Sequence, residues 1–410
     1  MMAIQVLYVC SGRSFHSQNP GRKIGSVVEC WRDMGHDITH VCGGDILSED
    51  SEPKEYGAQQ VYTRWYRKLP IFDPIVKSVS ERRDIQHDAL MFKALNSMVE
   101  QQRPDIIWER SSRLHCAGLK IARKIGVPYV LEWKDNLIAY PCSWYRQRAI
   151  KMEQQKVDEA DFIVVESDVL KHALAEEGVN QHKIITAHNA VDSDQFVPDE
   201  YRRMRTRKSL GIGDDEILIG YLGSYAFYHD TVRLVLAANI LNSYPMKNVR
   251  ILMVGAGQEY PKTRCLAEKL GVLNSVLMMK PGVPSGEVPG ILSALDIAVL
   301  PGSTDIICPI KIQEYMASEL PTVATDYACN REVITNGETG LLFEPKNENS
   351  LADKLFLLAK DSKLRKLLGR NARQEVVRRF TWKNTWGNAL QEIIRSLKIS
   401  PNYVGVSSNS

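Results

Sequence analysis

A lysine and a glutamate three positions apart, Lys311 and Glu314, have the residue types and spacing with the most specific chemistry in this sequence. Pro309 comes just before them and suits the first turn of a helix, so the two side chains would be neighbours on one helical face. A lysine near the start of such a helix can neutralise a phosphate group, and a carboxylate one turn later can bind two ribose hydroxyls. A surface ion pair is the alternative explanation of the same spacing.

The segments around this pair predict how it is positioned. Residues 296–300 and 321–325 are short apolar runs typical of buried strands, and residues 301–305 read as a loop. The helix that starts at Pro309 would therefore connect two parallel strands. Ligands of open parallel sheets bind beyond the carboxyl ends of the strands, so the helix would begin beside a binding site.

The same alternation of short apolar runs and amphipathic segments extends along the whole chain. It predicts an α/β fold with two Rossmann-like, doubly wound parallel-sheet domains that face a deep inter-domain cleft. In the first half, strands are predicted at residues 4–10, 37–42, 105–109, 129–133, 161–165 and 183–186. In the second half, strands are predicted at residues 216–222, 249–254, 276–279, 296–300 and 322–324.

A turn-rich segment, residues 188–198, separates the two series of strands and is interpreted as a linker. We expect one domain over residues 1–195 and another over residues 196–381. Residues 350–397 have helical character, and their last part, from about residue 382 to 398, is expected to cross back to the first domain. The polar, unpatterned residues 399–410 are expected to be a disordered tail.

Composition excludes several classes of protein. The chain has 410 residues, 44% of them hydrophobic and 25% charged, and its net charge of +3 is too small to indicate a nucleic-acid partner. It has no apolar run long enough for a transmembrane helix and no signal peptide at its start. Its eight cysteines form no C-x-x-C pair, which favours reduced thiols and a cytoplasmic location.

Six segments in chain order carry a family resemblance. They are residues 21–38, which run from Gly21 to the G-H-D-I sequence, and residues 188–198, 220–224, 254–257, 282–284 and 309–321. The chain resembles a retaining nucleotide-sugar glycosyltransferase of family 4 (glycosyl transferases group 1), and the resemblance covers nearly all of it. It implies the GT-B fold, with an acceptor-binding N-terminal domain and a donor-binding C-terminal domain.

The resemblance assigns roles on the donor side, with Lys311 and Glu314 as the catalytic residues. The donor-binding residues would be Gly223, Ser224, His229, Val283, Pro284, Asp305, Ile310, Lys311 and Glu314. The sequence departs from the family where Ser224 and His229 replace an arginine and a lysine that clamp the diphosphate. The first of two family glutamates is also missing. Lys311 would supply the lost charge, and Asp305 would stand in for the lost glutamate.

On the acceptor side, the resemblance points to residues at the start of the first domain and after its strands. They are Gly21, Glu109, Arg110, Glu132, Lys134 and Asp135. The family often carries a histidine at or near the position of Lys134. The mixed cationic and aromatic residues 64–72 would contact membrane lipid, place the protein at the inner membrane face or bind the acceptor; a solvated loop is the alternative.

The implied reaction transfers a sugar from a nucleotide-sugar, a UDP-sugar or alternatively a GDP-sugar, to a hydroxyl of a sugar, lipid-linked or small-molecule acceptor. It would retain the anomeric configuration, need no metal or other cofactor, and serve polysaccharide, glycolipid or natural-product glycan synthesis. A nucleotide-sugar 2-epimerase and a non-catalytic nucleotide-sugar-binding protein are the alternatives. A dinucleotide site is disfavoured because Tyr260 replaces the third glycine after Gly255 and Gly257.

Overall fold

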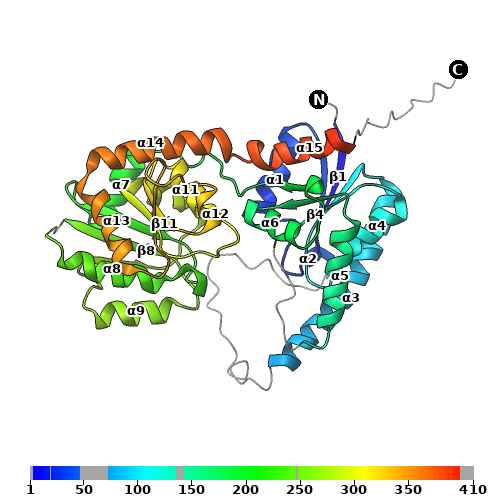
Figure 1. Cartoon of the computed structure of the whole chain (residues 1–410), viewed down its shortest axis with the longest axis horizontal. Helices are drawn as coiled ribbons and strands as arrows, with labels where there is room; N and C mark the ends of the chain where they lie inside the picture. Colours follow the sequence, from blue (N-terminus) through cyan, green and yellow to red (C-terminus); the bar gives the residue numbers. More distant parts are fainter. Residues whose placement is uncertain (1–2, 19, 47–72, 135–142, 246–247, 398–410) are drawn as a thin grey trace.

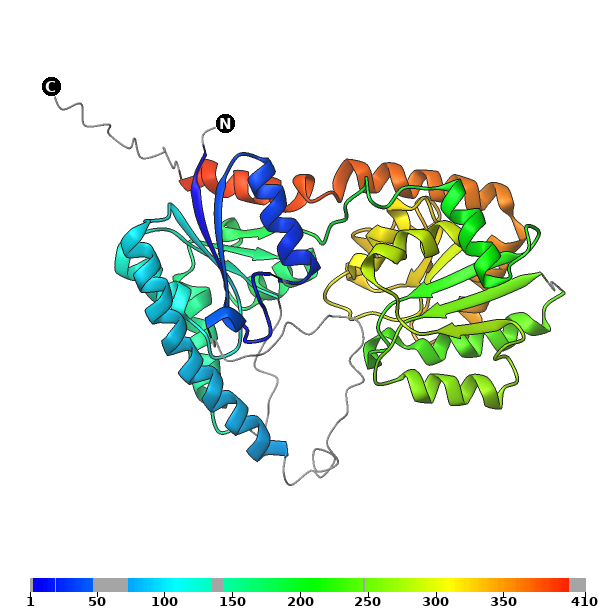
Figure 2. The same ribbon diagram turned by 180° about the vertical axis from the view of Figure 1, so that it is seen from behind.

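The computed structural model of this chain describes residues 3–18, 20–46, 73–134, 143–245 and 248–397. It contains two α/β domains, each built on one six-stranded sheet with helices packed on its faces (Figure 1). Figure 2 shows from behind that the domains lie side by side, with α14 and α15 in a row along one edge of both. The α/β prediction with two parallel sheets is confirmed.

The N-terminal sheet has the order β2-β1-β3-β4-β5-β6, and its paired strands are parallel. Its strands are β1 (Gln5–Cys10), β2 (Asp37–Cys42), β3 (Ile106–Arg110), β4 (Tyr129–Glu132), β5 (Phe162–Val165) and β6 (Ile184–Thr186). Its helices are α1 (Arg22–Asp33), α2 (Gly43–Ile46), α3 (Asp73–Gln101), α4 (Ala117–Ile125), α5 (Arg146–Glu159) and α6 (Asp168–Glu176). The strand order reverses between β1 and β3, which is where such sheets bind ligands.

The C-terminal sheet has the order β12-β11-β10-β7-β8-β9 and reverses between β7 and β10. Its strands are β7 (Ile217–Leu222), β8 (Val249–Val254), β9 (Leu277–Lys280), β10 (Ile297–Leu300), β11 (Thr322–Thr325) and β12 (Leu341–Phe343). Its helices are α7 (Glu200–Leu210), α8 (Thr231–Ser243), α9 (Tyr260–Lys269), α10 (Val288–Ala294), α11 (Ile310–Ala317), α12 (Ala328–Arg331), α13 (Glu348–Lys360) and α14 (Ser362–Arg379).

The predicted strands are all present, and each end is within one residue of its expected position. The edge strand β12 was not predicted, because three apolar residues are too short a run to be recognised by periodicity. Among the described helices, none combines the length and apolar composition that would let it cross a membrane. The expected tail and the 64–72 loop lie outside the described residues.

Burial follows the alternation of side chains along each strand. In β1, Val6 and Tyr8 belong to a core on one face of the sheet, whereas Leu7 and Val9 belong to a second core on the other face. A strand covered on both faces needs apolar residues at successive positions, which explains the continuous apolar runs in the sequence.

The chain returns to the N-terminal domain at its C-terminal end. After α14, a π-helical turn (Lys383–Gly387) leads into α15 (Asn388–Leu397). Trp386 in this turn is fully buried in the core that also contains Trp31, and the Trp31 Nε1 donates a hydrogen bond to the Trp386 carbonyl at 3.0 Å. The α14–α15 segment is therefore a second connection between the domains, beside the linker.

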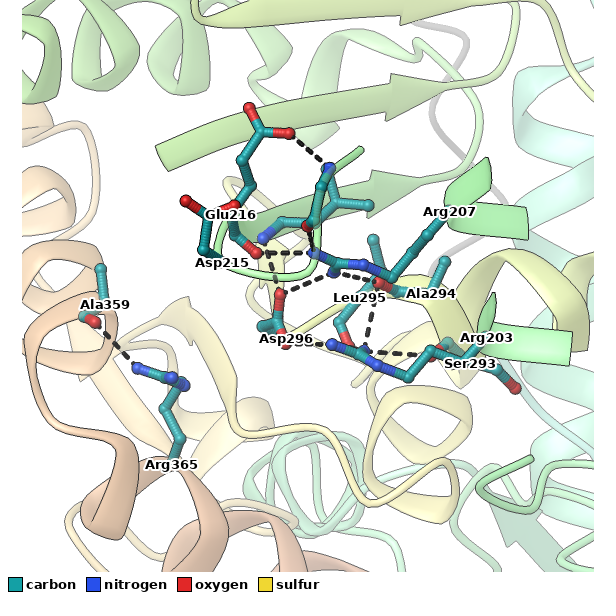
Figure 3. Close-up of polar contacts among 12 residues, drawn as sticks. Arg203, Arg207, Asp215, Glu216, Ser293, Ala294, Leu295, Asp296, Ala359 and Arg365 are labelled. Atoms are coloured by element: carbon teal, nitrogen blue, oxygen red, sulfur yellow. Dashed lines mark hydrogen bonds and ion pairs between the residues drawn. The ribbon is translucent and has the colours of Figure 1, made fainter. Parts of the chain in front are cut away.

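Helix α7 is held in the C-terminal domain by a cluster that we call the α7 arginine cluster, which consists of Arg203, Arg207 and Asp296 (Figure 3). Arg203 Nη2 lies 2.7 Å from Asp296 Oδ1, and Arg207 Nη1 lies 3.1 Å from Asp296 Oδ2. Both guanidinium groups also donate to carbonyl oxygens at the end of α10, such as that of Ala294. The cluster ties α7 to the start of β10.

Candidate active site between the two domains

A pocket of about 700 Å³ lies between the domains, beyond the carboxyl ends of strands in both sheets. We call it the interdomain pocket. Its lining residues from the N-terminal domain and the linker are Arg22, Lys23, Arg110, Lys134, Glu166 and Asn189. Those from the C-terminal domain are Leu222, Gly223, Ser224, Val254, Gly255, Ala256, Gly282, Val283, Val288, Ile310, Lys311 and Glu314.

Two glycine turns form one wall of the pocket. A Cβ atom at Gly223 would lie 2.0 Å from Lys311 Cε, and one at Gly255 would lie 1.8 Å from the Gly223 carbonyl oxygen. Only glycine lets the backbone after β7 approach the turn after β8 and the lysine side chain this closely. The wall therefore offers exposed backbone, with the Ser224 side chain at its edge.

Lys311 is held at the beginning of α11 by a histidine. Its Nζ lies 2.8 Å from His229 Nε2, and His229 Nδ1 lies 3.2 Å from the Gly302 carbonyl oxygen. Since a carbonyl only accepts, Nδ1 carries the ring hydrogen and Nε2 accepts from the ammonium group. Burial, with Lys311 beside it, lowers the pKa of His229 to about 4, which keeps the ring neutral.

The environment of Lys311 disfavours its protonated form. Burial lowers the pKa of Lys311 to about 8, although Glu314 acts in the opposite direction. A cation that is desolvated in this way is stabilised by any anion that enters the pocket beside it. Lys311 is thus suited to meet a phosphate group rather than a neutral ligand.

Glu314 is 5% exposed and faces cations from both domains. Its carboxylate forms an ion pair with Arg22, the first residue of α1 in the N-terminal domain. Burial raises the pKa of Glu314, while Arg22 and Lys311 lower it. A buried carboxylate with lone pairs directed at a pocket can accept from a ligand's hydroxyl groups.

The opposite wall contains a dense charged network. We call Lys23, Arg110, Lys134, Glu132 and Glu166 the basic wall. Lys23 Nζ lies 3.0 Å from Glu132 Oε1 and pairs with Glu166 as well. Lys134 Nζ lies 3.3 Å from Glu166 Oε1, and Arg110 Nη1 lies 3.6 Å from Glu132 Oε1.

The basic wall has more positive than negative charge. Burial alone would raise the pKa of Glu166, but Lys23, Lys134 and Arg110 together lower it, so it is ionised. Burial lowers the pKa of Lys134, and Lys23 and Arg110 lower it further. Arg110 Nη1 is buried without a hydrogen-bond partner. Three cations against two carboxylates leave an excess that an anionic ligand could neutralise.

Most residues singled out in the sequence meet at this pocket. From the donor-side set, Gly223, Ser224, Val283, Ile310, Lys311 and Glu314 line it. From the acceptor-side set, Arg110 and Lys134 line it. Glu132 and Gly21 do not line it: Glu132 is fully buried within the basic wall, where it pairs with Lys23, and Gly21 precedes α1 with a φ of 83° that favours glycine.

Other residues of the predicted sets lie away from the pocket lining. Asp305 is exposed and does not line the pocket, and its role in place of the missing glutamate stays a prediction. Pro284 is exposed beside Val283 and does not line the pocket either. His229 lies beneath Lys311 and supports it, instead of lining the pocket. Pro309 precedes α11 as its N-cap rather than lying in its first turn. Asp135 lies outside the described residues.

Glu109 is also placed away from the pocket. It is fully buried on the opposite face of the sheet, where its carboxylate accepts from the Tyr129 hydroxyl at 2.7 Å and from the Leu119 amide at 3.2 Å. The reason is the alternation of β3: Glu109 and Arg110 are successive residues, so their side chains point to opposite faces. Glu109 therefore supports α4, and its side chain does not line the pocket.

Sequence reasoning missed Arg22, Lys23, Glu166 and Asn189. A signal was present for the first two, because cations in the first turn of a helix oppose the helix dipole and usually need a nearby anion. Glu166 directly follows β5, a position of the kind that faces such a pocket. Asn189 lies in the linker, and its Nδ2 donates to the Cys308 carbonyl at 3.0 Å.

Comparisons with known proteins agree with this architecture. Residues 20–190 match the model of the "Glycosyl transferase 4-like domain", and residues 202–375 match that of "Glycosyl transferases group 1". A D-inositol 3-phosphate glycosyltransferase from Corynebacterium urealyticum is 31% identical over 258 residues, which are 61% of this chain and 60% of that protein. The aligned part of the chain thus spans about three fifths of the length of this curated relative.

Two solved structures share the fold. A glycosyltransferase from Rickettsia africae superposes with a TM-score of 0.73 at 17% identity, over 98% of this chain and 100% of that one. HepE from Anabaena, in complex with UDP and glucose, superposes with a TM-score of 0.68 at 15% identity, over 96% of this chain and 100% of that one. At these identities the structures support the two-domain arrangement itself.

Proposed function

Because this chain belongs to the glycosyl transferases group 1 family and has the GT-B fold, we propose that it transfers a sugar from a UDP-sugar to a hydroxyl of an anionic acceptor, with retention at the anomeric carbon. The observation that carries the proposal is the arrangement of Lys311 and Glu314 beside the Gly223 turn in one interdomain pocket. Uridine as the base is supported by the UDP complex of HepE.

The donor would lie along the C-terminal wall. Glu314 would accept hydrogen bonds from the two ribose hydroxyls, and Val283 would pack near the base. The diphosphate would lie over the Gly223 turn, where backbone amides, the Ser224 hydroxyl and the Lys311 ammonium can reach it. These groups replace the arginine and lysine that the sequence lacks at Ser224 and His229.

The transfer step needs charge stabilisation at the leaving group. The bond between the anomeric carbon and the β-phosphate oxygen breaks, and the acceptor oxygen bonds to the same carbon on the same face. The acceptor proton passes to the departing phosphate oxygen, which yields the glycoside and a nucleoside diphosphate. Lys311 stabilises the charge that grows on the phosphate, so this step is proposed to need no metal ion and no protein nucleophile.

The acceptor would lie against the basic wall. Lys23, Arg110 and Lys134 exceed their two carboxylate partners by one charge. Burial would lower the pKa of Arg110, but Glu132 raises it, whereas burial lowers the pKa of Lys134. The similar corynebacterial protein is named for D-inositol 3-phosphate, a phosphorylated polyol. Both observations favour an acceptor that carries a phosphate or carboxylate group next to the hydroxyl that reacts.

A thermal-shift panel tests the donor assignment. UDP, GDP, ADP and dTDP are added to the parent protein and to Glu314→Ala, with Glu268→Ala, a change at an exposed carboxylate of the same domain, as control. We expect UDP to raise the melting temperature of the parent and of the control more than the other nucleotides do. Glu314→Ala should lose about 2–4 kcal/mol of nucleotide affinity in calorimetry. Unaltered affinity in Glu314→Ala would remove α11 from the donor site.

A transfer assay tests the acceptor assignment. D-inositol 3-phosphate and unphosphorylated inositol are compared as acceptors with the donor that the panel selects. We expect the phosphorylated compound to have the higher kcat/KM, and the product's anomeric configuration, read by NMR, to match that of the donor. Equal kcat/KM for the two acceptors would contradict an anionic acceptor, and an inverted product would contradict retention.

A further inference from the structure

The C-terminal wall is short of positive charge for a diphosphate. Lys311 is the one cation that lines the described pocket from this domain, and His229 behind it is neutral. A nucleoside diphosphate group carries at least two negative charges, and more charge develops on it as the sugar leaves. A second cation is therefore expected within reach of the phosphates.

Arg22 of the opposite domain is placed to be that cation. It lines the same pocket as Gly223 and Lys311, and it already reaches across the cleft to Glu314. Its guanidinium carbon lies 4.9 Å from the centre of the Phe196 ring, in the linker region. Its side chain is 43% exposed, so it can change partner without disturbing a packed core.

Arg22 and a bound donor would compete for Glu314. The carboxylate pairs with Arg22 through one oxygen, and the ribose hydroxyls are proposed to bind the same group. Arg22 must then lose at least part of this contact at the moment when the diphosphate arrives next to Lys311. A released guanidinium beside a diphosphate has a new bidentate acceptor available.

We propose that Arg22 is a second phosphate-binding residue of the donor site: it pairs with Glu314 before a donor binds, and ribose binding releases it to the diphosphate. This inference rests on the proposed function, since it takes the donor to be a nucleoside diphosphate sugar. This exchange couples donor binding to contact between the domains. Arg22 would bind the phosphate of a donor held by the C-terminal domain, while Arg22 itself belongs to the N-terminal domain, which is proposed to hold the acceptor.

The position of Arg22 in the chain supports this role. It is the first residue of α1, where a cation opposes the helix dipole, and no acidic residue lies in the first turn to offset it. An anion from another element compensates this charge, and in the structure that anion is Glu314. The diphosphate would take over that compensation in the complex.

The test separates recognition of the diphosphate from recognition of the ribose. Calorimetric Kd values are measured for uridine, UMP and UDP with the parent, Arg22→Ala, Arg22→Gln and Arg22→Lys. Arg123→Ala serves as matched control, because Arg123 is a 44% exposed arginine of the same domain that pairs with Glu159. If another nucleoside diphosphate stabilises the parent most in the thermal-shift panel, its own series replaces the uridine series.

We expect Arg22→Ala and Arg22→Gln to bind uridine at least as tightly as the parent does, since Glu314 is freed. Their preference for UDP over uridine should fall about tenfold or more, because a charge-assisted contact is lost. Arg22→Lys should recover part of the preference, and Arg123→Ala should keep all of it. In turnover, Arg22→Ala should lower kcat, whereas loss of the Glu314 contact alone would change only binding.

Two outcomes would overturn the inference. An unchanged preference for UDP over uridine in both Arg22→Ala and Arg22→Gln would leave Arg22 as a partner of Glu314 and nothing more. A parent that binds none of the four nucleoside diphosphates would instead refute the proposed function, and the exchange with it. The two failures differ in the parent protein, so they are distinguishable.

Discussion

Two charged networks in this protein have similar residue types but differ in what compensates their surplus positive charge. In the α7 arginine cluster, Arg203 and Arg207 share the single carboxylate of Asp296, and the surplus positive charge is met by carbonyl oxygens at the end of α10 (Figure 3). In the basic wall, Lys23, Arg110 and Lys134 exceed Glu132 and Glu166 by one charge, and all three cations line the interdomain pocket. Each network has one buried guanidinium nitrogen without a hydrogen-bond partner, Arg207 Nε in the first and Arg110 Nη1 in the second.

The difference teaches how to tell a structural network from a binding site. Buried cations whose surplus charge is met by the protein's own backbone need nothing further, and they hold elements together. Buried cations whose surplus remains at the edge of a pocket are stabilised only when a ligand arrives. Lys311 belongs with the second kind, because within the described part of the chain its ammonium group contacts the neutral His229 and is opposed in charge by Glu314.

The largest expected effect is on kcat when Lys311 is removed, because a ligand is expected to compensate its charge. Lys311→Ala should lower kcat about 10²–10³-fold, because charge on the leaving phosphate is then unopposed. It should not lower the free energy of unfolding, since a desolvated cation is removed. Steady-state kinetics and urea unfolding measure the two effects, with Lys262→Ala, a 70% exposed lysine of the same domain, as control. A parental kcat would place the phosphate clamp elsewhere.

The next largest effect is on the free energy of unfolding when Arg207 of the α7 arginine cluster is removed. Arg207→Ala should lower the free energy of unfolding by about 3 kcal/mol, because Asp296 loses its buried arginine partner and three carbonyls lose a donor. Urea unfolding provides the measurement, and exposed Arg123→Ala is the matched control. A loss as small as that of the control would erase the distinction between the two networks.

A smaller effect is expected when the surplus charge of the basic wall is removed. Lys134→Met should raise KM for an anionic acceptor about tenfold while leaving Kd for the nucleotide unchanged. Stability should be kept or should rise, because the pKa of Lys134 is lowered by burial and by neighbouring cations. Kinetics with D-inositol 3-phosphate and calorimetry with UDP test both statements. Loss of stability without a change in KM would class the basic wall as structural.

The smallest effect is a pH dependence. The pKa of Lys311 is lowered to about 8, so its charged form is present below that pH and is lost above it. For the free enzyme, kcat/KM for the donor should therefore fall severalfold between pH 7 and pH 9. Lys311→Arg should abolish this decline, since a guanidinium does not titrate there. A decline of the same size in Lys311→Arg would assign the titration to another group.

Much of the fold was predictable because its signal is local. The eleven strands that were predicted from apolar runs are all present within one residue at each end. A strand buried on both faces must be apolar throughout, and this requirement is visible in a short window of sequence. The short strand β12 lacks such a window, so only its pairing with β11 reveals it.

The candidate site was predictable where it depends on one element and not where it depends on two. Lys311 and Glu314 share α11, so their spacing places them on one face before any tertiary contact is known. Glu109 and Arg110 are adjacent in sequence, and only the packing of β3 decides which of them faces the pocket. Asp305 follows β10 as a ligand would, yet its loop turns it toward solvent.

The sequence by itself determined the two parallel sheets and the helix that carries Lys311 and Glu314. The tertiary structure decided that Arg22 meets Glu314, that His229 supports Lys311, and that the basic wall faces the C-terminal domain. The physical reason is range: backbone periodicity acts over a few residues, whereas these contacts join residues up to 292 positions apart and depend on how the two domains pack against each other.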